Sequence, residues 1–139
     1  MTFHSHEPSR TFMRTVNCPF CTLPPSRIER SNELSFAVFD AYPVSEGHAL
    51  VIPRRHIMSV SDLTESEMLE IWRLLQVMRD LISATSAPDG FNIGVNDGAA
   101  AGQTVGHVHF HLIPRYTDDL PDPRGGVRWV LPAKARYWD

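Results

Sequence analysis

The feature of the sequence that most constrains the fold is a short segment in which histidines alternate with apolar residues. The segment reads HVHFHL, with His107, His109 and His111 alternating with Val108, Phe110 and Leu112. Successive side chains of a β-strand point to opposite faces, so this pattern predicts a strand over residues 107–115 with its apolar face on the core. The three histidines would share the other face, with about 6.5–7 Å between neighbouring Cα atoms, and would line a cleft or meet solvent.

A long amphipathic helix is the second strong feature. Thr64 and Glu67 form a capping-box pattern, which is typical of a helix N-terminus. Apolar residues then recur at three- and four-residue spacing, which predicts a helix over residues 65–84 with one buried face. The residues expected on that face are Met68, Ile71, Trp72, Leu75, Met78 and Ile82.

Three further segments are apolar and β-prone. They predict strands over residues 33–43, 48–56 and 91–96, with Pro53 closing the second. The order along the chain is then two strands, one long helix and two strands. This order favours an α+β fold with an antiparallel sheet over alternating βαβ units, whose strands would be parallel.

Length and composition limit the domain organisation. The chain has 139 residues, which is enough for one domain with a hydrophobic core and too few for two ordinary ones. Residues 1–16 are polar and are expected to form a poorly ordered tail. Residues 117–139 form a C-terminal extension that we expect to pack on the domain or on a partner subunit. Its short apolar run, VRWVL, would form an edge strand or a packing arm.

Charge and hydropathy exclude some classes of partner. The net charge is −3, and no basic cluster is dense enough to indicate nucleic-acid binding. No apolar run reaches the length of a membrane span, and the first residues lack the apolar region of a secretory signal. We therefore expect a cytoplasmic protein with neither nucleic acid nor membrane as its partner.

The three aligned histidines admit more than one interpretation. They could be half-buried residues that alternate by chance, or three ligands of a zinc ion. They could also perform phosphoryl chemistry, because neutral imidazole is a nucleophile near pH 7 and an imidazolium stabilises phosphate charge. The preceding loop, DGAAAGQ, favours phosphate, because its glycines allow backbone N–H groups to approach an anion and Gln103 and Thr104 add neutral hydrogen-bonding groups.

The only two cysteines form a C-x-x-C pair, Cys18 and Cys21. In a reducing compartment such a pair is more often a metal or redox element than a structural disulfide. A closed zinc site would need two more ligands.

Several segments together resemble the histidine-triad (HIT) superfamily. GQTVGHVHFHLIPR resembles its signature, and the flanking GQTV and IPR are most similar to the fragile-histidine-triad hydrolases and bacterial relatives. FAVFDAYPVSEGHALVIPRRH resembles the strands that carry the family's nucleotide pocket. The resemblance covers about residues 17–116, the expected HIT domain. It implies a homodimer in which the sheets of two subunits join into a larger one.

The resemblance also implies roles for individual residues. His109 would attack the α-phosphate of a purine nucleotide and form a nucleotidyl-histidine intermediate, while His111 would hydrogen-bond the phosphate oxygens. Gln103 and Thr104 would contact the phosphate and assist the leaving group. The remaining substrate-binding residues would be Asp40 at the ribose, Phe39 and Leu50 at the base, His48 beside the triad, and Asn96 and Gly102 near the phosphates.

The implied activity is hydrolysis or nucleotidyl transfer on dinucleoside polyphosphates or adenylyl conjugates, without a catalytic cofactor. The alternative is a nucleotide-binding regulatory module with low turnover. Some bacterial relatives bind zinc through an N-terminal C-x-x-C, the histidine of a P-x-x-H segment and the first triad histidine. By this resemblance a structural zinc ion would be held by Cys18, Cys21, His56 and His107.

Overall fold

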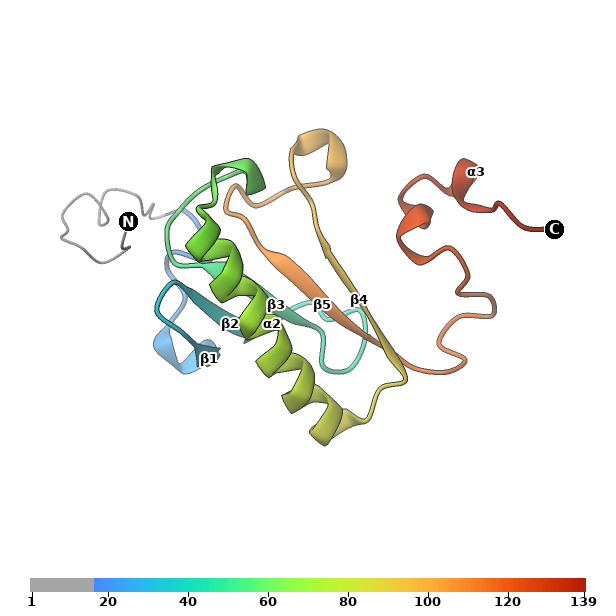
Figure 1. Ribbon diagram of the computed structural model, residues 1–139, viewed down its shortest axis with the longest axis horizontal. Coiled ribbons are helices and arrows are strands. Elements are labelled where there is room, and N and C mark those ends of the chain that lie inside the picture. Colours follow the sequence, from blue (N-terminus) through green and yellow to red (C-terminus); the bar gives the residue numbers. More distant parts are fainter. Residues whose placement is uncertain (1–16) are drawn as a thin grey trace.

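A five-stranded antiparallel sheet covered on one face by a long helix forms the body of the protein (Figure 1). The structure, a computed structural model, describes residues 17–139, so the predicted tail over residues 1–16 lies outside the described residues. The strand order is β1-β2-β3-β5-β4, which confirms the predicted α+β class. The elements are β1 (Ile28–Ser31), β2 (Ser35–Phe39), β3 (Ala49–Pro53), α2 (Glu65–Ser86), β4 (Gly90–Val95), β5 (Phe110–Arg115) and α3 (Pro132–Ala135).

Several strand boundaries differ from the predicted ones. The strand predicted over residues 48–56 ends at Pro53, the residue predicted to close it. β1 was not predicted, because its sequence IERS is polar and largely exposed. The strand predicted over residues 33–43 ends at Phe39, because the Asp40 carboxylate accepts a hydrogen bond from the Tyr42 backbone N–H and begins a turn. The strand predicted over residues 107–115 is regular only from Phe110 onwards.

Helix α2 begins where the capping box places it. The Thr64 hydroxyl accepts a hydrogen bond from the Glu67 backbone N–H, and the Glu67 carboxylate accepts one from the Thr64 N–H. None of the helices within residues 17–139 combines the length and the hydropathy needed to cross a membrane.

The buried face of α2 differs in part from the predicted one. Ile71, Leu75, Met78 and Ile82 are buried as predicted, and Leu74 joins them. The prediction was wrong for Met68 and Trp72, which are 38% and 53% exposed. Met68 and Trp72 each follow a buried residue, Glu67 and Ile71, by one position, so they lie at the flank of the buried stripe.

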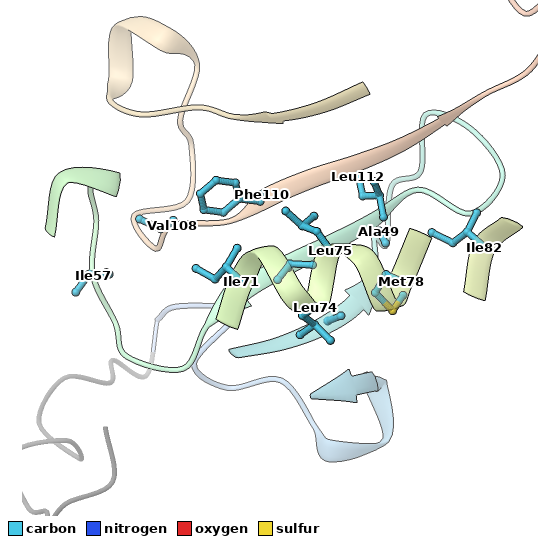
Figure 2. Close-up of a cluster of buried hydrophobic side chains, with 12 residues drawn as sticks. Ala49, Ile57, Ile71, Leu74, Leu75, Met78, Ile82, Val108, Phe110 and Leu112 are labelled. Atoms are coloured by element: carbon cyan, nitrogen blue, oxygen red, sulfur yellow. The ribbon is translucent and has the colours of Figure 1, made fainter. Parts of the chain in front are cut away.

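The core lies between α2 and the sheet, as Figure 2 shows. Val108, Phe110 and Leu112 are part of this core, which confirms the packing predicted from the alternation. The opposite face of the sheet carries a smaller cluster, against which the segment before β1 packs. That cluster contains Phe36, Val38, Leu50 and Ile52, with Phe20, Leu23 and Ile28 packed against it. The histidine face is therefore partly covered by the N-terminal segment.

The C-terminal extension forms a 3₁₀ turn and the short helix α3 beside the β4 edge of the sheet (Figure 1). Of the two forms expected for VRWVL, an edge strand or a packing arm, the edge strand was wrong, because Gly126–Val130 is a 3₁₀ helix. Gly125 and Gly126 have positive φ angles of 92° and 43°, and the Arg128 guanidinium donates hydrogen bonds to the backbone oxygens of Lys134 and Ala135, which closes the segment on itself. Whether the extension packs on a partner subunit stays a prediction.

Candidate active site and metal centre

Two of the three histidines open onto a cavity of about 410 Å³ on the face of the sheet opposite α2. This volume lies in the range of small-molecule sites. His111 pairs in register with Leu50 of β3 and with Gly94 of β4, so no β4 side chain stands beside its ring. Eight of the predicted substrate-binding residues line the cavity: Phe39, Asp40, Leu50, Asn96, Gly102, Thr104, His109 and His111.

The ring of His109 is held in one tautomer by the backbone. Its Nδ1 atom lies 2.8 Å from the carbonyl oxygen of His107. A carbonyl oxygen only accepts hydrogen bonds, so Nδ1 carries the proton and donates it. The unprotonated nitrogen of the neutral ring is then Nε2, which is the atom that can act as a nucleophile.

The ring of His111 is oriented through His48. The backbone N–H of Val44 donates to Nδ1 of His48, at 3.1 Å, so the proton of the neutral His48 ring lies on Nε2. That Nε2 atom lies 2.9 Å from Nδ1 of His111 and donates to it. His111 must then carry its own proton on Nε2, where it can donate a hydrogen bond to a ligand.

Burial keeps both of these rings neutral. Burial, together with the neighbouring His109 and His48, lowers the pKa of His111 to about 4. Burial also lowers the pKa of His48, although the Asp40 carboxylate, 3.5 Å from its Nε2 atom, opposes this shift. Two hydrogen bonds, from the Val44 N–H to His48 and from His48 to His111, form a relay. Near pH 7 both imidazole rings in this relay are therefore neutral.

Gln103 differs in its position from the other predicted phosphate contacts. Its side-chain oxygen accepts a hydrogen bond from the Gly98 N–H at 2.8 Å, and its amide nitrogen donates to the carbonyl oxygens of Met58 and Val105. These bonds hold the loop that carries Gly102 and Thr104 to the cavity. The predicted contact of Gln103 with phosphate stays a prediction.

A second cluster lies behind the first triad histidine and contains all four predicted zinc ligands. The Sγ atoms of Cys18 and Cys21 and the Nδ1 atoms of His56 and His107 lie within 4.8 Å of one another. Nδ1 of His107 lies 3.5 Å from the Cys18 sulfur, 3.6 Å from the Cys21 sulfur and 3.2 Å from Nδ1 of His56. The Cys21 sulfur lies 3.2 Å from Nδ1 of His56.

These separations fit a tetrahedral zinc ion. With Zn–S bonds of about 2.3 Å and Zn–N bonds of about 2.05 Å, a tetrahedral ion places its ligand atoms about 3.3 Å (N to N), about 3.6 Å (N to S) or about 3.8 Å (S to S) apart. His107 also donates from Nε2 to the Pro53 carbonyl oxygen at 2.8 Å, which leaves its Nδ1 lone pair for a metal and is the usual outer contact of a zinc-bound histidine. Burial lowers the pKa of His107 to about 4, so the ring is in the neutral form that binds metals.

Sequence reasoning missed several residues of the cavity. Phe20, Leu23, Arg27 and Tyr42 line it alongside the predicted set. Phe20 and Leu23 reach it because the cysteine turn folds back over the sheet, and the Arg27 guanidinium is held there by a hydrogen bond to the Phe39 carbonyl oxygen. Only the position of Phe20 between the two cysteines could have indicated this contact.

Comparison with known proteins identifies the family. The HIT domain family matches residues 24–118. The chain belongs to the HIT family. The bis(5'-adenosyl)-triphosphatase of Dictyostelium discoideum is 42% identical over 95 residues, which are 68% of this chain and 64% of that protein.

Solved HIT structures share the fold. A HIT family protein from Bacillus subtilis superposes with a TM-score of 0.67 at 35% identity, over 73% of this chain and 74% of that one. A zinc-bound histidine triad family protein from Mycobacterium smegmatis superposes with a TM-score of 0.68 at 30% identity, over 84% of this chain and 92% of that one. The family match and these structures confirm the resemblance on which the HIT domain was predicted.

Proposed function

We propose that this HIT protein is a nucleotide hydrolase that cleaves at the α-phosphate through a covalent intermediate on His109. The observation that carries the proposal is the hydrogen bond from His109 Nδ1 to the His107 carbonyl oxygen, which makes Nε2, beside the cavity, the unprotonated nitrogen of the neutral ring. The Dictyostelium relative named bis(5'-adenosyl)-triphosphatase supports substrates in which adenosine is joined through a polyphosphate. Dinucleoside polyphosphates and adenylyl conjugates are the substrates we expect.

The proposed reaction has two steps. The lone pair on His109 Nε2 attacks the α-phosphorus, a P–N bond forms, and the bond from phosphorus to the leaving group breaks. Water then attacks the same phosphorus and loses a proton to solvent, the P–N bond breaks, and the electron pair returns to Nε2 as the nucleoside monophosphate leaves. The Nε2–H of His111 would donate to a phosphate oxygen in both steps, where a fixed donor stabilises developing charge.

The rest of the cavity would bind the nucleoside. Asp40 stands at the end of β2, where its carboxylate could accept hydrogen bonds from ribose hydroxyls, and Phe39 and Leu50 supply apolar surface for the base. Gly102 and Thr104 would face the phosphates.

The experiment that tests this proposal follows AMP release from diadenosine tetraphosphate and from adenosine phosphoramidate. Wild type should release AMP from at least one of them, and His109→Ala should not, while AMP binding by the variant is retained. A quench in alkaline denaturant should preserve a protein species heavier by one adenylyl group in wild type alone. Equal turnover by His109→Ala would overturn the nucleophile assignment, and binding without turnover in wild type would favour the regulatory module.

We also propose that the Cys₂His₂ cluster binds structural zinc. The ligand geometry fits this ion, and the Mycobacterium smegmatis relative is zinc-bound. A reducing compartment would keep both thiols available, in agreement with the predicted cytoplasmic location. The metal would hold the N-terminal segment to the sheet and take no part in the bond-breaking steps.

A homodimer is the assembly that the surface supports. β4 is an edge strand, and its face toward α2 carries Ile93, which is 37% exposed. Helix α2 also carries an exposed apolar side chain, Trp72, on the side from which Arg79 stacks over Phe91 of β4. Light scattering on wild type and on Ile93→Lys tests the proposal: the wild type should have the mass of two chains and the variant a lower mass.

A further inference from the structure

The turn between the two cysteines contacts both the metal cluster and the proposed nucleophile. Phe20 lies inside this turn, and its ring centroid is 5.9 Å from that of His107 and 5.0 Å from that of His109. The first ring belongs to the metal cluster and the second lines the cavity. One aromatic side chain therefore touches both sites.

We propose that metal occupancy and nucleotide binding are thermodynamically coupled through Phe20, so that the loaded metal site raises the affinity for nucleotide. This inference rests on the nucleotide site proposed above. It adds that the affinity of that site for nucleotide depends on whether the metal site is occupied. Both cysteines are buried, and Phe20 in the turn and Leu23 just after it line the cavity while they pack against Val38 and Leu50 of the sheet.

A bound metal would strengthen the attachment of this turn, which the packing of Phe20 on the smaller apolar cluster of the sheet also supports. Two hydrogen bonds shape the turn: the Thr22 N–H donates to the Cys18 carbonyl oxygen at 3.2 Å, and the Cys21 N–H points at the Cys18 sulfur at 3.4 Å. The turn precedes β1 and is not part of the sheet. Its two sulfurs reach His107 and His56, so an ion bound to all four residues would join the turn to the loop after β3 and to the start of the β5 segment.

Fixing the turn has two consequences at the cavity. Phe20 is held against the His109 ring, which limits the orientations of that ring. Phe20 and Leu23 also provide a rigid apolar wall for a nucleobase, so less conformational freedom is lost when the nucleotide binds. In the metal-free protein the wall would be held by its apolar contacts with the sheet alone, so nucleotide binding would cost more of its remaining conformational freedom.

Coupling of this kind is reciprocal, so it can be measured from both sides. If the metal raises AMP affinity by some factor, AMP must raise metal affinity by the same factor. We expect a factor of about five or more, the lower end of typical couplings between sites. Cobalt(II) is the probe metal, because it binds such sites more weakly than zinc and its affinity is therefore measurable.

The experiment measures AMP binding by calorimetry in metal-free and cobalt-loaded wild type, and cobalt binding by its visible absorption with and without AMP. Circular dichroism checks that the metal-free protein keeps its sheet. Phe20→Ala should bind one cobalt per chain with a coupling factor below about two, whereas Phe20→Tyr should retain the coupling. Phe91→Leu, an aromatic substitution on β4 that leaves the cysteine turn intact, should behave like wild type.

The outcomes separate this proposal from the one on which it rests. Equal AMP affinity in metal-free and loaded wild type would overturn the coupling and leave the nucleotide site intact. Full coupling in Phe20→Ala would overturn the role of Phe20. Failure of the loaded wild type to bind AMP would overturn the proposed function and the coupling together.

Discussion

The Nε2 atom of His48 lies 2.9 Å from the Nδ1 atom of His111, and the Val44 backbone N–H fixes which of the two nitrogens donates. A backbone amide can only donate through its N–H. The Val44 N–H therefore determines which nitrogen donates and which accepts in each of the two hydrogen bonds, from Val44 to His48 and from His48 to His111. The consequence is a neutral His111 that presents an N–H to the cavity.

The first prediction concerns this relay. His48→Ala should reduce the rate of AMP release by about 10- to 100-fold, the range seen when the partner that orients a functional histidine is removed. AMP affinity should change less than the rate, because His48 stands behind His111 and is not among the residues that line the cavity. Single-turnover kinetics measure the rate, and ¹⁵N chemical shifts of the imidazole nitrogens report the tautomer of His111. An unchanged tautomer in the variant would contradict the relay.

The second prediction concerns acid stability. The pKa of His111 is about 4 in the folded protein and about 6.5 in an unfolded chain. Above pH 6.5 both states are neutral and the shift contributes nothing. Between pH 6.5 and 4 the unfolded state binds a proton that the folded state does not. The free energy of unfolding therefore decreases as the pH is lowered through this range.

Replacing the ring isolates this effect. His111→Gln should lose less stability than wild type between pH 7 and 4.5, by on the order of 1 kcal/mol once solvent screening at this partly exposed ring is included. Urea denaturation at a series of pH values measures the difference. Parallel stability profiles for the two proteins would contradict the depressed pKa.

The third prediction concerns the start of α2. Glu67 is 3% exposed, caps the helix, and accepts hydrogen bonds from Arg55 at 2.7 and 3.0 Å. Burial opposes its ionisation, but the hydrogen bonds from Arg55 and Thr64 outweigh burial and lower its pKa. Glu67→Gln should destabilise the protein by about 2–4 kcal/mol, because Arg55 loses its partner in a partly buried site.

The same substitution should loosen the neighbouring metal ligand, since Arg55 directly precedes His56 in the chain. Thermal melting measures the loss of stability, and cobalt titration measures the weakened metal affinity. Glu65→Gln, which changes an exposed carboxylate of the same helical turn, is the matched control and should have little effect.

The fourth prediction concerns metal removal. Purified protein should contain about one zinc ion per chain, and complete chelation should lower the melting temperature by about 10 °C or more, since structural zinc contributes several kcal/mol to folding. Cys21→Ser should lower the metal content in the same way. An unchanged melting temperature after full removal would contradict a structural ion, and lost activity in a protein that melts normally would favour catalytic zinc.

Local sequence patterns were enough to predict which side chains of the histidine segment face the core and where the long helix begins. The alternation at residues 107–112 gave the burial of Val108, Phe110 and Leu112, because strand geometry alone assigns their face. The capping box of Thr64 and Glu67 correctly predicted the start of helix α2. Burial along α2 was predicted less well, because Met68 and Trp72 satisfy the helical period but lie at the flank of the buried stripe, where they stay exposed.

The candidate site required more than local patterns. The ligand set of Cys18, Cys21, His56 and His107 was expected from family resemblance, and the structure brings its members together from three distant segments. Phe20 was missed because its contact with His109 exists only once the cysteine turn lies on the sheet. The role of Gln103 in holding its loop was missed because its partner Met58 is 45 residues away.

The distances along the chain between the metal ligands bear on the unfolded state as well. Cys21 and His56 are 35 residues apart, and His56 and His107 are 51 residues apart. An ion that keeps these residues together in a partly unfolded chain would close two long loops and reduce chain entropy, as a cross-link does. Early capture of the ion would then shorten the search by which the first and last strands find the same sheet, so refolding with metal should be faster as well as more complete.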